Sequence, residues 1–289
     1  LVHNEIDHAG ETAEGMYLGC NDDACRVHDS LIADNHIHDL DGASVTQGDG
    51  IEIKAGSYAN TVRDNVIHDP AYPGIILYHT NGNGAPNVIE RNLVWNSGDN
   101  GIQVTADAIV RNNIVLGATA AGIGVSPQQG GVPGNLVIVD NTVLKASGDA
   151  IHLSGVAGPI LVADNALYAQ AGNAIFVNGT TAMVTSIGNV GSGALNGIAG
   201  GFDAGGDLAT DFGAASWSGA PPQDLVPRNG RLVGSADAAT LARDDFNGVP
   251  RYPQRDVGAY RANPDGNPGW VLQAGFKTVL GIFADGFER

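Results

Sequence analysis

Glu52 and Lys54 alternate with Ile51 and Ile53 in the short stretch GDGIEIKAG, residues 48–56. Because side chains alternate across a strand, the isoleucines face one side and the charged residues face the other. A lysine in a partly desolvated groove can lose its proton and act as a general base, with a nearby Tyr or His as proton donor. A solvated charged face, or a charge pair of little consequence, is the simpler explanation of the same pattern. The choice depends on what lies beside this strand.

A repeat through the chain predicts those neighbours. One pattern recurs at intervals of 21 to 31 residues: an apolar residue, two variable residues, Asn, one variable residue and an apolar residue. Its copies are LVHNEI (1–6), IADNHI (32–37), VRDNVI (62–67), IERNLV (89–94), VRNNIV (110–115), IVDNTV (138–143), VADNAL (162–167) and SIGNVG (186–191). Short strands in units of this length predict an all-β fold, a parallel β-helix solenoid. We expect the Asn residues to take a left-handed backbone at a sharp turn and to hydrogen-bond in a ladder.

A second element follows most copies, with Gly or Ala before two apolar residues that flank one variable position. These elements are GMYLG, GIEIK, GIILY, GIQVT, GIGVS, AIHLS and AIFVN, which begin at residues 15, 50, 74, 101, 122, 150 and 174. Stacked coils align equivalent positions about 4.8 Å apart. The outward column then contains Tyr17, Glu52, Ile76, Gln103, Gly124, His152 and Phe176, with Lys54 beside Tyr78 and His79 in the next column. This mixture of residue types predicts a carbohydrate groove.

The residue types in the groove fit a polysaccharide lyase. Such an enzyme must neutralise a uronate carboxylate, remove the proton beside it and protonate the leaving oxygen. We expect Lys54 to be the base, Tyr78 or His79 to be the acid, and Glu52 to hold the lysine or a cation. Residues predicted to contact sugar are Tyr17, Gln103 and His152, together with Arg63, although the strand position of Arg63 directs it away from the groove.

The stretch DGIEIKAGSYANTVRDNVI, followed by PGIILYHTNG, loosely resembles polysaccharide lyase family six, the alginate lyases and chondroitinase B. That resemblance implies a base at Lys54 and a calcium site that includes Asp49. Tyr78 stands where the family has an acid arginine, and Gln47 replaces another calcium carboxylate. More broadly, residues 1 to about 200 resemble the right-handed parallel β-helix proteins that bacteria secrete.

The resemblance implies three parts. The β-helix covers 1–200, and we expect its N-terminal coils to be incomplete because Leu1 begins inside a repeat. An irregular C-terminal capping segment covers 201–262 and contains DFNGVPRYPQRDVGAYR. A tail covers 263–289, and its IFADGFER is similar to the short tails of secreted proteobacterial proteins.

Composition narrows the partners. A net charge of −17 without clustered Lys and Arg argues against nucleic acid, and no apolar run reaches the length of about 20 residues that spans a membrane. An acidic surface repels a polyanion unless a basic group or a cation offsets it. The Ca²⁺ that the resemblance implies is the one cofactor expected. The expected partner is a polysaccharide, an acidic glycan above all, and we expect the protein to be a monomer.

The only two cysteines, Cys20 and Cys25, are close in sequence. Their spacing favours a disulfide over half of a metal site, and therefore a secreted or periplasmic protein.

Two other functions remain open. A β-helical glycoside hydrolase needs paired carboxylates, for which Glu52 has only Asp49 and Asp99 nearby. A non-catalytic binding, adhesive or cell-surface protein needs only the scaffold.

Overall fold

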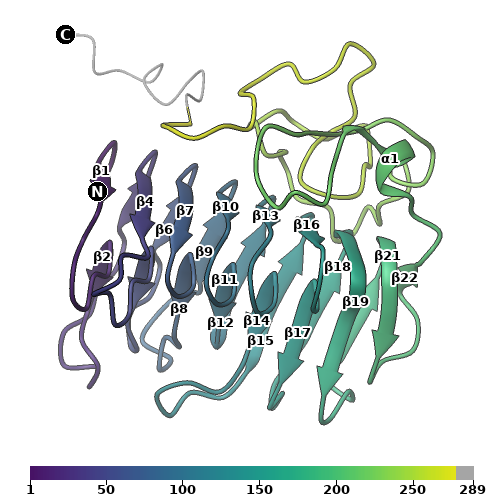
Figure 1. Ribbon diagram of the computed structural model, residues 1–289. Coiled ribbons are helices and arrows are strands. Elements are labelled where there is room, and N and C mark those ends of the chain that lie inside the picture. The colour runs from purple at the N-terminus through teal and green to yellow at the C-terminus, as the bar shows by residue number, and fades with distance from the viewer. Residues whose placement is uncertain (278–289) are drawn as a thin grey trace, which may run out of the picture.

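The computed structural model describes residues 1–277, and Figure 1 shows a row of stacked coils. Their strands form three sheets, in each of which the strands run parallel to one another. Sheet 1 contains β1 (Glu5–Asp7), β4 (His36–Leu40), β7 (Val66–Pro70), β10 (Leu93–Trp95), β13 (Ile114–Leu116), β16 (Thr142–Lys145), the first half of β19 (Ala166–Asn178), β21 (Asn189–Asn196) and β22 (Phe202–Asp203). Every strand pairs in parallel with the equivalent strand of the next coil. The predicted parallel β-helix is confirmed.

Two further faces complete each coil. Sheet 2 contains β2 (Met16–Leu18), β5 (Ile51–Ile53), β8 (Ile75–Leu77), β11 (Ile102–Val104), β14 (Ile123–Val125), β17 (Ile151–Ser154) and the second half of β19, which joins it to sheet 1. Sheet 3 contains β3 (Leu31–Ala33), β6 (Thr61–Arg63), β9 (Asn87–Glu90), β12 (Ala106–Arg111), β15 (Gly134–Val139), β18 (Ile160–Ala163) and β20 (Val184–Ile187). Inward Ile, Val and Leu side chains of all three sheets form one continuous core. Ile51 and Ile53 belong to it, which turns Glu52 outward.

The predicted asparagine ladder is confirmed. The side-chain amide of each Asn donates to the carbonyl oxygen of the next one, at 2.8–3.0 Å, through Asn4, Asn35, Asn65, Asn92, Asn113, Asn141, Asn165 and Asn189. The left-handed backbone lies one residue earlier than predicted. Asp64 and Asp140, which precede ladder asparagines, have φ of 56° and 55°. This turn aims the following Asn side chain into the coil, where it can stack.

The segment after β22 folds back along the outer face of sheet 1 (Figure 1). It contains α1 (Leu208–Asp211), β23 (Phe212–Ala214) and β24 (Asp224–Pro227), and β23 and β24 pair in antiparallel fashion. Its buried contact with the sheet includes Val66, Leu93, Ile114, Tyr168, Leu225, Phe246, Val257 and Tyr260. Lys277 ends the described chain fully buried, with Nζ 3.0 Å from Asp64. The segment predicted to be a cap therefore lies along the side of the β-helix.

The part boundaries at residues 200 and 262 stay predictions. The predicted tail, 263–289, lies partly outside the described residues, and its IFADGFER lies wholly outside them. Within residues 1–277, no helix has both the length and the apolar character needed to cross a bilayer.

Candidate active site

The outward column predicted for sheet 2 is present in the expected register. Tyr17 pairs with Glu52, Glu52 with Ile76 and Ile76 with Gln103, and the column continues through Gly124, His152 and Phe176. Parallel pairing places each residue next to its equivalent on the neighbouring coil. The repeat therefore brings side chains that are far apart in sequence into one row.

Glu52 and Lys54 lie at the centre of this row, and they are buried. Nζ of Lys54 donates to Oε1 of Glu52 at 2.6 Å, and each side chain is 4% exposed. The hydroxyl of Tyr78 donates to the same oxygen at 2.9 Å. The alternative of a solvated charged face is thus excluded. Burial and the nearby Glu52 carboxylate raise the pKa of Tyr78 well above its ordinary value, so the phenol keeps its proton.

Two aromatic rings enclose the lysine. Its Nζ lies 4.8 Å from the ring centre of Tyr17 and 4.5 Å from that of Tyr78. Tyrosine faces attract a cation, and the rings also exclude water from the ammonium group. The ion pair therefore sits in a partly desolvated setting, unlike the exposed pairs that contribute little.

These residues line a cavity of about 380 Å³. Its other walls are Asn21, Thr46, Gln47, Asp49, Tyr72, Pro73, Ile76, Asp99, Gln103, Gln128 and Gln129. Among the described residues that line the cavity, Lys54 is the only one with a basic side chain. The space is large enough for a small ligand, and its walls are mainly polar and aromatic, as in sugar sites.

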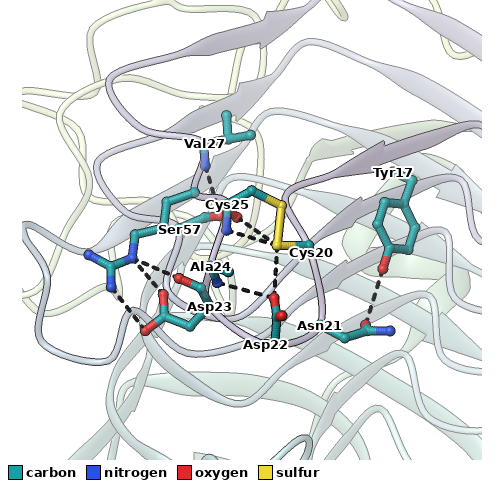
Figure 2. Close-up of a disulfide and its surroundings, with 10 residues drawn as sticks. Tyr17, Cys20, Asn21, Asp22, Asp23, Ala24, Cys25, Val27 and Ser57 are labelled. Carbon is teal, nitrogen blue, oxygen red and sulfur yellow. Dashed lines mark hydrogen bonds and ion pairs between the residues drawn. A yellow bond between two sulfur atoms is a disulfide. The ribbon is translucent and has the colours of Figure 1, made fainter.

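The disulfide loop forms one wall of the cavity. Cys20 and Cys25 are bonded, as predicted, and Figure 2 shows Asn21 of this loop turned toward Tyr17. The Tyr17 hydroxyl donates to Oδ1 of Asn21 at 3.1 Å, and the side-chain amide of Gln129 donates to the same oxygen at 3.0 Å. The loop therefore fixes Tyr17 over the lysine and joins a second loop, which extends over the groove from a distant coil.

Three carboxylates form a cluster beside the ion pair. One oxygen each of Glu14, Asp49 and Glu52 lies within 4.8 Å of the others. Burial, then the charges of Glu52 and Glu14, raise the pKa of Asp49 to about 7. Oε2 of Glu52 is buried and has no hydrogen-bond partner among the described residues. Carboxylate oxygens are the ligands that Ca²⁺ prefers, so this donor set fits a calcium ion.

Glu14 is the member of this cluster that the sequence pattern did not single out. It occupies the position before the Gly that opens the second element of its coil, and Asp49 occupies the same position in the next coil. The amide of Gly15 donates to the carbonyl of Asp49, which confirms the stacking. Alignment of these positions, in addition to the outward ones, would have found Glu14.

Three predicted site residues lie elsewhere. His79 contacts the carbonyl of Gln129 at 3.3 Å and lines a separate hollow with Asp107. His152 pairs with Asp149 at 2.8 Å in another hollow farther along sheet 2. Arg63 lies on β6 of sheet 3, 3.7 Å from Asp64. His79 lies beyond the end of β8 at Leu77, where the chain turns away from sheet 2 and the strand alternation no longer places side chains in the row.

Two solved structures are similar to this one at a low level. One is described as the PL6 family alginate lyase AlyGC and is 14% identical, with a TM-score of 0.48. The matched region covers 94% of this chain and 42% of the AlyGC chain. The other is XylC in complex with xylose, which is 16% identical and has a TM-score of 0.44. The matched region covers 66% of this chain and 35% of the XylC chain. This chain spans less than half the length of either structure. Likeness at this level carries no conclusion about activity.

The sequence comparisons are more direct. No curated protein matches the sequence. A family model described as "Right handed beta helix region" matches residues 1–167, which is more than half of the 289 residues. The chain therefore belongs to the right-handed β-helix family.

Proposed function

We propose that the protein is a polysaccharide lyase that cleaves a uronate-containing glycan by β-elimination in the cavity around Lys54. The observation that carries the proposal is the contact of Lys54, Glu52 and Tyr78 in the cavity floor. A base and a proton donor side by side are what β-elimination requires. The base takes the proton next to the uronate carboxyl, the bond to the leaving oxygen breaks, a carbon–carbon double bond forms, and the leaving oxygen takes up a proton.

Lys54 is the proposed base. In the resting site its ammonium group is held by Glu52, so it must first lose a proton. The neighbouring carboxylate cluster supports a way to achieve this. A cation held by these carboxylates would draw on the charge of Glu52 and so weaken the hold of Glu52 on the Lys54 ammonium group. Tyr17 and Tyr78 enclose the amine from two sides and keep water away from it.

Tyr78 is the proposed proton donor. Its raised pKa keeps the phenol protonated at any working pH, the form that an acid needs. The Tyr78 hydroxyl and the Lys54 amine both contact Oε1 of Glu52. Once Tyr78 has protonated the leaving oxygen, the proton taken by the lysine can therefore return to the tyrosine through this Glu52 oxygen. Tyr17 and Gln103 lie on the coils to either side and are the proposed sugar contacts.

Ca²⁺ is the proposed cofactor, held by Glu14, Asp49 and Glu52. The fit rests on the clustered carboxylate oxygens and on the buried, unpartnered Oε2 of Glu52. A bound cation would neutralise the substrate carboxylate, which the acidic walls of the cavity otherwise repel.

The test is a panel of uronate-containing glycans, with formation of unsaturated uronate ends followed by absorbance. Lys54→Arg is the sharpest variant, because arginine keeps the positive charge next to Glu52 but does not give up a proton. We expect the rate to fall about 10²–10⁴-fold, the usual share of a general base. Unsaturated products at the wild-type rate from a folded Lys54→Arg variant would rule out Lys54 as base. Binding without turnover by the wild-type protein would favour a non-catalytic carbohydrate-binding protein.

A glycoside hydrolase is the second candidate, and the Asp49 site favours it. A carboxyl group whose pKa is about 7 suits a general acid, and Glu52 offers a second carboxylate within 4.8 Å. The products separate the two reactions, since a hydrolase forms new reducing ends without unsaturation.

For either reaction we propose that the protein works outside the cytoplasm, secreted or periplasmic, because the Cys20–Cys25 disulfide persists in oxidising compartments.

A further inference from the structure

A second cluster of ligand-type side chains lies on the outer face of sheet 1, away from the groove. His36 and His38 are two residues apart on β4 and share a face, and His38 pairs in register with His68 on β7. One ring nitrogen of each lies within 4.8 Å of the others. His36 and His68 are buried, and His38 is 14% exposed in its side chain. Three imidazoles on neighbouring strands are a donor set typical of transition-metal sites.

A carboxylate orients two of these rings. Nδ1 of His38 lies 2.7 Å from Asp39, and Nδ1 of His68 lies 2.6 Å from Asp69. Each Asp has a left-handed backbone, with φ of 53°, which brings its side chain back to the preceding histidine. A ring that donates its Nδ1 proton to a carboxylate presents the lone pair of Nε2. This arrangement is the one that metal-binding histidines almost always have.

The free nitrogens face one another. Nε2 of His36 lies 3.0 Å from Nε2 of His68, and the amide of Gly275 donates to the same His36 nitrogen at 3.2 Å. Nε2 of His36 is therefore a hydrogen-bond acceptor. Nε2 of His68 is also an acceptor, as long as Nδ1 of His68 carries the proton that Asp69 accepts. Two lone pairs at this distance repel unless a positive charge lies between them. A metal ion or a single shared proton can supply it.

A carboxylate and two aromatic rings border the cluster. Oε1 of Glu5, on β1, lies 3.4 Å from Nδ1 of His36 and 3.4 Å from Nε2 of His38, so it contacts the His36 ring at the nitrogen opposite Nε2. Trp95 stacks on His68 with ring centres 4.2 Å apart, and Phe276 meets His36 edge-on at 6.0 Å. The cluster is thus screened from water on the side of the C-terminal segment.

We propose that His36, His38 and His68 form a binding site for a divalent transition-metal ion. Imidazole ligands suit Zn²⁺, and three protein donors leave the fourth position of its usual tetrahedral coordination to water. The ion would join β4 and β7 and would take the place of the Gly275 hydrogen bond on His36. The site differs from the carboxylate cluster of the groove in ligand type, since hard oxygen donors there prefer Ca²⁺.

The test is titration of metal-stripped protein with Zn²⁺ by calorimetry, in excess Ca²⁺ so that the groove carboxylates are occupied. We expect one Zn²⁺ per chain, a higher thermal midpoint with Zn²⁺, and visible absorbance bands of a tetrahedral site with Co²⁺. The double variant His36→Ala/His68→Ala should lose all three. Asp69→Asn keeps every ligand and should weaken Zn²⁺ binding about 10–100-fold. The matched controls are His28→Ala and Asp29→Asn, which alter an exposed His–Asp pair and should leave binding unchanged.

Two results would overturn the proposal. One is stoichiometric Zn²⁺ binding of unchanged affinity in both the double variant and Asp69→Asn, which would place the ion elsewhere. The other is no Zn²⁺ uptake by the wild-type protein, together with a thermal midpoint that changes with pH where histidine titrates. That second result would assign the space between His36 and His68 to a shared proton.

Discussion

Lys54 and Glu52 form an ion pair at 2.6 Å in which neither side chain is more than 4% exposed. From the sequence alone, removal of this lysine would be expected to leave stability almost unchanged. The structure changes that expectation, because loss of one partner leaves the other charge buried without compensation.

The first prediction is a double-mutant cycle on this pair. Lys54→Met and Glu52→Leu should each lower the free energy of unfolding by about 3 kcal/mol, the usual loss when one partner of a buried pair is removed. The double variant should lose clearly less than the sum, because it leaves no unpaired charge. Urea denaturation measures all three. Additive losses would mean that the two side chains are not coupled in solution.

The second prediction separates the Tyr78 hydroxyl from its ring. Tyr78→Phe keeps the ring that lies 4.5 Å from Lys54 but loses the hydrogen bond to Glu52. If Tyr78 is the proton donor, kcat for unsaturated product should fall about 10²–10⁴-fold, with a smaller change in KM. Tyr72→Phe is the matched control, since Tyr72 lines the same cavity and is 45% exposed. An equal effect of the two substitutions would argue against a specific role for Tyr78.

The third prediction concerns the pH dependence of stability. The pKa of Asp49 rises from 3.8 to about 7 in the folded protein. Between these values the folded state binds a proton that the unfolded state has released, so stability falls as pH rises. The contribution of Asp49 should amount to at most about 4 kcal/mol across that window.

Asp49→Asn should therefore stabilise the protein at pH 8 and have little effect at pH 4, in urea denaturation with a calcium chelator present. Asp41→Asn, at an exposed carboxylate, is the control and should not change the pH profile. Added Ca²⁺ should stabilise the wild-type protein most at pH 8, where Asp49 is ionised, and this gain should vanish in Glu14→Gln. A pH profile that is the same for wild type and Asp49→Asn would contradict the raised pKa.

The fourth prediction concerns the asparagine ladder. Asn65 donates to Asn92 and to the carbonyl of Ile32, and it accepts from Asn35. Asn65→Ala should cost about 3 kcal/mol, because buried groups on both neighbouring coils lose a partner. Asn4→Ala is the comparison at the exposed end of the ladder and should cost clearly less. Equal costs, measured by thermal or urea unfolding, would mean that the interior of the ladder contributes nothing extra.

Much of the fold and part of the site could be predicted from the repeat. The copies of the second element, which begins with Gly or Ala, place Glu52 beside Tyr17 and Ile76 and bring Tyr78 next to Lys54, as the structure confirms. The repeat could not show that the residue before each Asn takes the left-handed turn, because Asp and Asn both tolerate it. Nor could it place His79, since the strand ends at Leu77 and periodicity ends with it.

The sequence by itself determined the register of the stacked strands. Each coil must bury its Ile, Val and Leu residues, and a shift by one residue would turn all of them outward, so the spacing admits one alignment. Only the tertiary structure decided that the Glu52–Lys54 pair is buried and that the last segment lies on sheet 1. Both depend on irregular loops: Gln129 reaches Asn21 across 108 residues, and Lys277 reaches Asp64 across 213. Such contacts follow no period, because shape and charge complementarity between distant segments select them.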